Sequence, residues 1–371
     1  MSEQLDLFGE PHDSTAAGGR PATPDQHDRD LVTDALGTTL FVEAGAGSGK
    51  TTALVGRVVN LVLEGVPITG IAAITFTEKA AAELRVRIRE RLDATAAALA
   101  RDHLGYSLAH TALADLDTAP IGTLHAFARR LLNEFPVEVE LPPRFEVLDE
   151  VQSATAFHER FTDFLEALLD DTASVRLVEL CQYDRFGVEK GVRRMAEDFQ
   201  ANWDLVQECV AAEVPPQVDT DTVQRALAAS CRAVTGFEPP RGDSQETVRA
   251  AFAEFAAAFA DELPFGELLR LLELVGKAKA KGNSADWKKH HGSADVLPAF
   301  KQAVTDAAEL ARQTLVRCNE ERRLTIGALL RAFTLDSVQA RRADGTLEFH
   351  DLLVLARRMV AEHEGVRAQL H

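Results

Sequence analysis

A glycine-rich segment, AGAGSGKT at Ala44–Thr51, constrains the fold of this 371-residue chain more than any other stretch. The apolar run TTLFVEA precedes it and is typical of a buried strand. The run KTTALVGRVVNLVLEG follows it, with the pattern of a helix that ends near Gly65. A glycine-rich turn between a strand and a helix presents backbone N–H groups at the positive end of the helix, and such groups bind phosphate. The segment therefore predicts an α/β domain with a phosphate-binding loop.

This loop fits the Walker A pattern with alanine in place of the first glycine. Lys50 and Thr51 are the predicted catalytic residues: Lys50 is expected to reach the phosphates of ATP, and the Thr51 hydroxyl is expected to ligate Mg²⁺. The alternative is a chance glycine-rich turn, but a strand and a helix flank this one as the mechanism requires. The predicted ATP-binding residues of the loop are Ala44, Gly45, Ala46, Gly47, Ser48, Gly49, Lys50, Thr51 and Thr52.

The segments beyond the loop continue the alternation of strand and helix as far as about residue 150. GIAAITFT predicts a second strand, and EKAAAELRVRIRERL predicts a helix. Residues 151–340 have mostly helical patterns with almost no strand signal. We therefore predict a parallel α/β domain interrupted by a large all-helical insertion. The predicted apolar face of the first long helix consists of Ala81, Leu84, Ile88 and Leu92.

The composition is that of an ordinary globular chain, with 46% hydrophobic and 26% charged residues. No apolar run approaches the roughly 18 residues that span a membrane, and the N-terminal residues lack a secretory signal, so we expect no membrane partner and a cytoplasmic protein. The net charge of −18 argues against nucleic acid wrapped over the whole surface but allows a local basic groove. Four widely spaced cysteines match no metal or redox pattern: Cys181, Cys209, Cys231 and Cys318.

Four further segments occur in a fixed order around the loop. They are TPDQHDRDLV with Gln26, ITFTEKAAAELRVRIRERL at 74–92, IGTLHAF at 121–127 and GTLEFHDLL at 345–353. Together with the loop they resemble the UvrD/RecB/AddA helicases, which move along single-stranded DNA using ATP. The resemblance implies an ATP-dependent DNA helicase or translocase that acts in repair or recombination. It also implies a P-loop NTPase (RecA-like) fold, with ATP and Mg²⁺ as cofactors. The implied partners are single-stranded DNA and a nuclease or second helicase subunit.

The same resemblance predicts the domain organisation. A disordered tail at 1–22 precedes the first part of the motor domain at 23–145, the helical insertion spans 146–344, and 345–371 return to the motor domain. The family's second acidic motif follows the EFHDLL-type segment, so we expect this chain to end before it. The isolated chain is therefore expected to hydrolyse ATP weakly or not at all.

Site residues follow from the matched motifs. Gln26 is expected to read the adenine edge, because its amide offers both a donor and an acceptor. The predicted DNA-binding residues are Thr75, Phe76, Thr77, Lys79, Thr123, His125 and Phe127. The alternative for Phe76 is a place in the core, and Thr77 could also serve as an N-cap.

Five lysines crowd one stretch of the insertion: Lys277, Lys279, Lys281, Lys288 and Lys289. One hypothesis is a contact with a DNA duplex junction, with Trp287 available to pack against sugar or base. The simpler alternative is a solvated loop.

The stretch EVLDEVQS contains Asp-Glu-x-Gln, the pattern with which helicases hold magnesium and orient water. A magnesium-holding pair sits at the end of a buried apolar strand, whereas Glu146, Pro142 and Pro143 interrupt this one. We interpret Asp149 as the N-cap of a helix, paired with Gln152.

Two other functions remain as hypotheses. A non-catalytic nucleotide- or DNA-binding module, working together with a partner chain, would explain the same motifs without the later ones. A small-molecule P-loop kinase would leave TFTEKAAAELRVRI and GTLHAF unexplained.

Overall fold

The structure is a computed structural model that describes residues 25–45, 47–170, 187–261 and 263–370, except for the side chains of 187–190. Its contacts divide the chain into two compact units, Met1–Leu131 and Leu132–His371. The predicted tail at 1–22, Ala46 and Cys181 lie outside the described residues.

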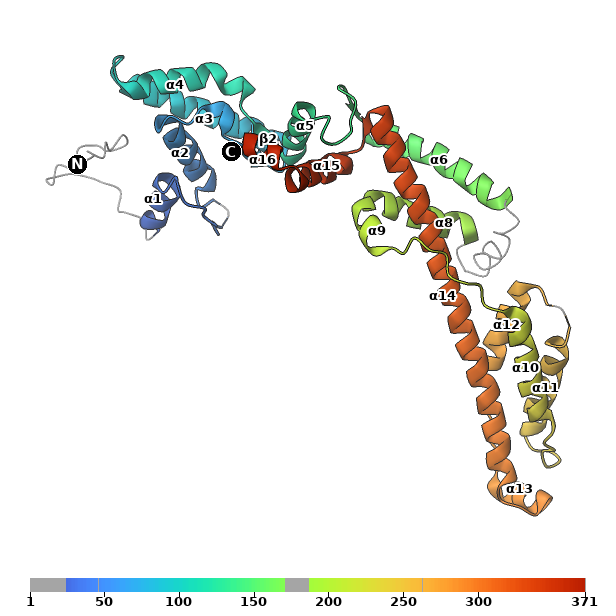
Figure 1. Cartoon of the computed structure of the whole chain (residues 1–371). Helices are drawn as coiled ribbons and strands as arrows, with labels where there is room; N and C mark the ends of the chain where they lie inside the picture. Colours follow the sequence, from blue (N-terminus) through green and yellow to red (C-terminus); the bar gives the residue numbers. More distant parts are fainter. Residues whose placement is uncertain (1–24, 46, 171–186, 262, 371) are drawn as a thin grey trace. The chain divides into compact units, whose positions relative to one another are not determined.

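Helices make up most of the first unit (Figure 1). Its elements are α1 (Gln26–Asp34), α2 (Lys50–Leu63), η1 (Ile68–Gly70), β1 (Ala73–Thr75), α3 (Glu78–Ala98), α4 (Leu104–Asp115), η2 (Leu116–Thr118) and β2 (Ile121–Thr123). Helix α5 (Leu124–Glu134) begins in this unit and ends beyond its boundary. Strands β1 and β2 pair in parallel, and α3 and α4 form the crossover between them.

The helices of the first unit form as their sequence patterns predict. The four predicted apolar residues of α3 are all buried: Ala81, Leu84, Ile88 and Leu92. They share one core cluster with the apolar face of α2, except for Ala81. Gly65 follows α2 with a φ of 94°, a left-handed conformation that glycine adopts without a steric penalty. The predicted helix end at Gly65 is therefore confirmed.

The strand predicted at TTLFVEA is wrong for the described residues. Residues 39–45 have no strand conformation, and the Phe41 side chain is 95% exposed. A strand is stable only when a neighbouring strand binds its backbone, and no described segment does so here. Arg57 of α2 instead donates to the carbonyls of Leu36 and Thr38 at 3.3 and 3.1 Å. Among the described residues, the α/β class is thus represented by two small parallel sheets rather than one large sheet.

The second unit contains the segment that was predicted to be a helical insertion, residues 146–344. Its elements are β3 (Glu146–Val147), α6 (Glu150–Asp170), α8 (Gly187–Ala201), α9 (Trp203–Cys209), α10 (Thr220–Thr235), α11 (Gln245–Ala258), α12 (Phe265–Gly276), α13 (Ser284–His291), α14 (Val296–Asp344), β4 (Thr346–Leu347), α15 (Phe349–Glu362) and α16 (Glu364–Leu370). Helix α14 has 49 residues and is therefore roughly 70 Å long.

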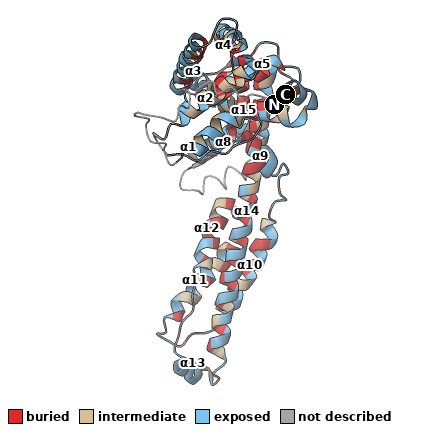
Figure 2. Cartoon of the chain, turned by 90° about the vertical axis from the view of Figure 1, so that its left-hand side faces the viewer, coloured by how far each residue is buried: buried red, intermediate tan, exposed pale blue. Residues whose placement is uncertain are grey.

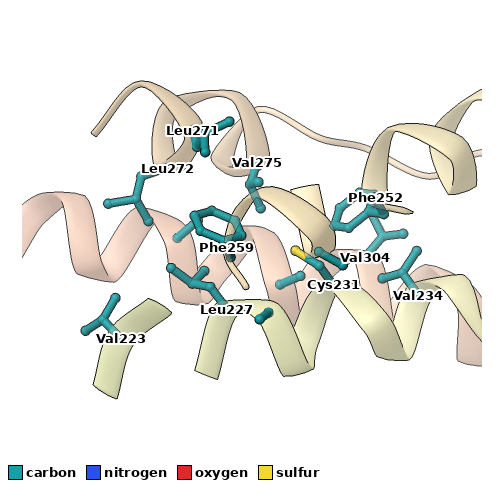
Figure 3. Packing of buried hydrophobic residues seen from close by; sticks show 14 of the residues in the cluster. Val223, Leu227, Cys231, Val234, Phe252, Phe259, Leu271, Leu272, Val275 and Val304 are labelled. Carbon is teal, nitrogen blue, oxygen red and sulfur yellow. The ribbon is translucent and has the colours of Figure 1, made fainter. Parts of the chain in front are cut away.

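Helices α10, α11 and α12 pack beside one half of α14 (Figures 1 and 2). Each helix turns its buried residues inward and its exposed residues to solvent, as Figure 2 shows. In α10 the buried positions Val223, Leu227, Cys231 and Val234 recur every three or four residues, which is one face of a helix. Figure 3 shows these side chains in one cluster with Phe252, Leu272 and Val304 from the neighbouring helices. Full burial of a large apolar side chain stabilises the fold by roughly 1.5–3 kcal/mol, so this cluster holds the helices together.

A sharp turn joins α14 to α15. Helix α14 ends at Gly345, which has a φ of 69°, and a Cβ there would lie 2.6 Å from Cγ of Pro142. Only glycine fits this position without displacing the proline. Strand β4 follows and pairs in parallel with β3, which places Leu347 opposite Val147.

A buried polar network lies at the same turn. The Asp351 carboxylate, 1% exposed, accepts hydrogen bonds from Nε and Nη2 of Arg341, both at 3.0 Å. It also accepts from Nε1 of Trp203 at 2.9 Å and from the backbone N–H of Glu348 at 2.9 Å. The Arg341 side chain is fully buried. A buried charge is tolerable only when it is paired and hydrogen-bonded, as these two groups are.

The expectations for membrane-spanning segments and for the cysteines can be compared with the described residues. None of the helices described there has the length and apolar character needed to cross a membrane. Three of the four cysteines are free thiols; Cys209 is exposed, while Cys231 and Cys318 are buried.

Candidate nucleotide and DNA site

The glycine-rich loop leads directly into the N-terminus of α2. Gly47 and Gly49 have φ values of 75° and 88°, so both require the left-handed conformation that glycine allows. Gly49 is the N-cap residue of α2, and the Ser48 hydroxyl donates to the Gly45 carbonyl at 2.7 Å. The first N–H groups of α2 have no partner inside the helix, which leaves them available to an anion. The loop therefore has the backbone geometry of a phosphate site.

Lys50, Thr51 and Thr52 are exposed at the first turn of this helix. The Lys50 ammonium donates to the carbonyls of Ala44 and Gly45, at 2.6 and 2.7 Å. It is thus folded over its own loop. Phosphate oxygens carry more negative charge than carbonyls, so they would compete effectively for the same ammonium.

Gln26, the predicted adenine-reading residue, begins α1. Its side-chain amide donates to Asp30 one turn later at 2.7 Å, and the residue is exposed. The neighbouring Arg29 was missed by sequence reasoning. Its Nη2 donates to the Ser48 carbonyl at 2.8 Å, which links α1 to the phosphate loop. The spacing of three residues from Gln26 was the available signal, because it places both side chains on one helix face.

A cavity of about 510 Å³ lies between α1, residues 36–42 and α2. Its lining combines apolar side chains, among them Val32 and Leu54, with the cationic Lys50 and Arg57. Gln26 is not part of the lining. The cavity is therefore continuous with the lysine end of the loop, while the predicted base-reading residue lies outside it.

The predicted DNA-contact residues gather where β1 and β2 end. The parallel register places Thr75 directly opposite Thr123. Phe76 follows β1 with its side chain 99% exposed, so the alternative of a core position is wrong. Lys79 is exposed in the first turn of α3. Ligands of open α/β sheets bind at this carboxyl end of the strands, which is the edge these side chains occupy.

The threonines of this edge make local hydrogen bonds. Thr77 accepts from the Ala80 N–H at 3.1 Å and is the N-cap of α3, as its alternative interpretation predicted. The Thr75 hydroxyl donates to the Thr77 carbonyl at 3.1 Å. Thr123, 8% exposed, donates to the Glu78 carboxylate at 3.0 Å and accepts from an N–H of α5 at 3.2 Å. These hydroxyls shape the two strand ends, while Phe76 and Lys79 project from them.

The remaining predicted DNA-binding residues, from the segment IGTLHAF at 121–127, lie on α5. His125 and Phe127 are half-buried. Their spacing of two residues directs them to different sides of the helix. The bond to Glu78 thus brings Thr123 close to the residues at 75–79. His125 and Phe127 lie further along the chain, on α5.

Asp149 forms a capping box rather than a metal site. The backbone N–H of Gln152 donates to Asp149 Oδ1 at 2.8 Å, and the Asp149 N–H donates to Gln152 Oε1 at 2.9 Å. These reciprocal bonds start α6 at Glu150. The interpretation of Asp149 as a helix N-cap is confirmed.

The basic stretch of the insertion includes α13. All five lysines of this stretch are exposed. Trp287, however, is 1% exposed and donates from Nε1 to Asp243 at 2.9 Å. The hypothesis that Trp287 packs against a sugar or base is therefore wrong, because its ring belongs to the core of the insertion.

Side chains that could ligate a metal ion are dispersed. Across the described part of the chain, no three or more His, Cys, Asp and Glu side chains are grouped as they would be around a metal ion. The Thr51 hydroxyl, the predicted metal ligand, is exposed at the start of α2.

Comparisons with known proteins agree with these motifs. A family model described as "UvrD/REP helicase N-terminal domain" matches residues 25–371. A Lactobacillus acidophilus protein, named as a subunit of an ATP-dependent helicase/nuclease, is 33% identical over 159 residues, which are 42% of this chain and 13% of the relative. Proteins of the same name from Lactobacillus helveticus and Streptococcus equi subsp. zooepidemicus are 36% and 33% identical over 124 and 147 residues. These segments are 33% and 39% of this chain but 10% and 12% of those relatives. The chain thus spans a small part of the length of the curated relatives it matches.

Proposed function

Because the chain belongs to the family of UvrD/REP helicase N-terminal domains, we propose that it binds ATP and single-stranded DNA within an ATP-dependent DNA helicase or translocase. One observation carries the proposal: a phosphate loop at the start of α2 and a strand edge bearing Phe76 and Lys79 occur in one compact unit. Repair or recombination is the proposed process. A nuclease or a second helicase subunit is the proposed partner, since the relatives are named as helicase/nuclease subunits. The cytoplasm is the proposed location, because the relatives are bacterial proteins and bacterial DNA lies in the cytoplasm.

The nucleotide is bound mainly through its phosphates. The N–H groups of the loop and of the first turn of α2 face them, and the Lys50 ammonium leaves the carbonyls of Ala44 and Gly45 to bind them. Gln26 offers a donor and an acceptor to the adenine edge.

Mg²⁺ fits the oxygen chemistry of this site. When bound, it neutralises phosphate charge and helps the transfer of the terminal phosphoryl group. The exposed Thr51 hydroxyl would hold it, and phosphate oxygens and water suit the remaining positions, because Mg²⁺ keeps several waters and takes few protein ligands.

The DNA strand is bound at the edge formed by β1 and β2. Phe76 offers an open aromatic face on which a base can stack, worth about 1–3 kcal/mol. Lys79 and the N-terminus of α3 attract a backbone phosphate. Thr75 and Thr123 lie opposite each other at the strand ends, and their hydroxyls bind Thr77 and Glu78, which helps to fix the start of α3 beside the proposed DNA strand.

A duplex junction is the proposed ligand of the basic stretch on the insertion. Lys279, Lys281, Lys288 and Lys289 are exposed, and none of them forms an ion pair with another described residue. Unpaired cations on a chain of net charge −18 mark a place where phosphates would be attracted locally. Since each phosphate contact contributes about 0.9 to the salt slope, replacing Lys288 and Lys289 by alanine should reduce the slope of duplex binding by up to about two. An unchanged slope would refute this contact.

Titration of the 371-residue chain tests the ATP and single-strand sites. Fluorescent ATP and a fluorescent oligothymidine should both bind. Lys50→Ala should abolish ATP binding and leave oligonucleotide binding intact. Phe76→Ala should weaken oligonucleotide binding by about fivefold to a hundredfold and leave ATP binding intact. ATP binding that survives Lys50→Ala, or a chain that binds neither ligand, would overturn the proposal.

A further inference from the structure

Arg29 connects the helix of Gln26 to the phosphate loop. Its Nη2 donates to the Ser48 carbonyl at 2.8 Å. Its Nε and Nη2 also donate to Oδ2 of Asp25, at 3.1 and 2.8 Å. A Cβ on Gly49 would lie 2.9 Å from Nη1 of Arg29, so the guanidinium packs directly against the residue that caps α2. Asp25, the N-cap residue of α1, thus fixes the guanidinium of Arg29, and the guanidinium in turn binds the phosphate loop.

The orientation of one peptide follows from this contact. A trans peptide is planar, so its C=O and N–H groups point in opposite directions. Arg29 holds the Ser48 carbonyl on the α1 side, and the Gly49 N–H must therefore point away from α1. In a phosphate loop the N–H groups face the ligand. Rotation of this one peptide would replace a donor by a carbonyl and would repel the phosphates.

We propose that Arg29 is a positioning residue that keeps the Ser48–Gly49 peptide in the orientation that a triphosphate requires. The inference rests on the proposed ATP site. It also assigns a role to Asp25, which binds the guanidinium at two nitrogens and so restricts its rotation. Gln26 and Arg29 are three residues apart on α1, and the base-reading residue and the loop-orienting residue therefore move together.

A positive charge near the phosphates would also strengthen ATP binding by attraction alone, without orienting the Ser48–Gly49 peptide. Arg29→Lys separates the two effects. Lysine keeps the charge, but its single ammonium cannot reproduce the fork that joins Asp25 to Ser48. If Arg29 positions the peptide, Arg29→Lys should bind ATP almost as weakly as Arg29→Ala. If Arg29 acts by its charge alone, Arg29→Lys should bind ATP almost as tightly as the parent chain.

The experiment measures ATP and adenosine affinity of the 371-residue chain by titration calorimetry. Arg29→Ala and Arg29→Lys should each weaken ATP binding about tenfold or more, the effect of losing a charge-assisted hydrogen bond, and leave adenosine binding unchanged. Arg87→Ala is the matched control, because Arg87 is an exposed arginine of the same unit whose side chain binds Glu83. Its ATP affinity should stay within about twofold of the parent chain.

Thermal unfolding without nucleotide distinguishes a local effect from loss of the fold. If the Arg29 variants unfold earlier than the parent chain, Asp25→Asn provides the second test, because it loosens the arginine and leaves it in place. Asp25→Asn should weaken ATP binding while adenosine binding is retained. Parent-like ATP affinity in Arg29→Ala, in Arg29→Lys or in Asp25→Asn would overturn the inference. If Lys50→Ala still abolished ATP binding in that case, the proposed function would stand without it.

Discussion

The buried network at the turn between α14 and α15 allows one stability prediction to be worked from its contacts. Asp351 accepts four hydrogen bonds, two from Arg341, one from Trp203 and one from the backbone of Glu348. Asp351→Asn preserves the shape of the side chain and removes its charge. The new amide nitrogen would face at least one of these donors, since asparagine has one acceptor oxygen in place of two.

The size of the expected loss in unfolding free energy follows from the burial of Arg341 and Asp351. Arg341 has no exposed side-chain surface and Asp351 is 1% exposed, so water cannot replace the lost partner. Removing one partner of a buried, hydrogen-bonded ion pair costs about 3–5 kcal/mol, mostly because the other charge is left uncompensated. By contrast, Glu83→Gln breaks an exposed pair with Arg87 and should cost less than about 1 kcal/mol.

Trp203 is a local probe for this measurement, because it belongs to the network and the chain has only one other tryptophan. In a Trp287→Phe background, urea unfolding followed by fluorescence reports on the turn. With a slope of about 3 kcal/mol/M, Asp351→Asn should lower the midpoint by about 1–1.7 M. The exposed control Glu83→Gln should leave the midpoint unchanged within error.

A midpoint for Asp351→Asn equal to that of Glu83→Gln would refute the reasoning. It would mean that water reaches Arg341, or that the guanidinium finds another acceptor such as Glu348, which lies 3.6 Å from its Nη1. The double variant Asp351→Asn with Arg341→Met identifies the cause. It should be more stable than Asp351→Asn alone, because no buried charge is then left without a partner.

Three further predictions concern ionisation, thiol reactivity and the loop. Burial raises the pKa of Glu348 above its ordinary value of 4.5, so the stability contributed by its protonated form is present at low pH and is lost as the pH rises through the raised pKa. Glu348→Gln should therefore gain stability relative to the parent chain as the pH rises above 4.5, measured as the urea midpoint. Burial raises the pKa of Cys231 to about 12, so iodoacetamide should label the exposed Cys209 and leave Cys231 unlabelled until urea is added, as read by peptide mass spectrometry. Gly49→Ala should abolish ATP binding in a titration, because its φ is 88° and a Cβ would meet a guanidinium, whereas Gly266→Ala in α12, with open space around it, should bind normally.

Features encoded by neighbouring residues were predictable from the sequence. The buried face of α3 repeats every three or four positions, and the end of α2 is marked by Gly65. These signals depend on backbone geometry within a few residues, so tertiary context has little effect on them. The helical nature of the insertion was predictable for the same reason.

Features that depend on distant residues were not predictable. The run TTLFVEA has the composition of a strand, but a strand forms only where another strand binds its backbone. Trp287 lies in a lysine-rich stretch that suggested exposure, while its ring packs against Phe300 and its indole N–H reaches Asp243. The bond from Arg29 to Ser48 spans nineteen residues, and no local pattern identifies the carbonyl that a given arginine will bind.

The site was predictable in its backbone and less so in its side chains. The glycines of the loop adopt the left-handed conformations that a phosphate loop needs, because glycine conformation is local. The parallel pairing of β1 with β2 joins segments on either side of two helices, so it depends on distant residues. The roles of Gln26, His125 and Phe127 stay predictions, since they depend on how a ligand would approach. Thr123 illustrates the difference: its motif suggested a DNA contact, and its hydroxyl is already bound by Glu78.

The Asp-Glu-x-Gln sequence shows why a four-residue pattern does not determine its chemistry. At the end of a buried strand, the first carboxylate would meet a metal ion, and its charge would be neutralised there. At Asp149 the chain instead enters a helix, whose first N–H groups need acceptors. The Asp149 carboxylate and the Gln152 amide satisfy each other's backbone N–H, at 2.8 and 2.9 Å. The preceding residues decide between the two outcomes. The strand before Asp149 is the two-residue β3, which contains a glutamate and follows two prolines, whereas a metal site requires a buried apolar strand.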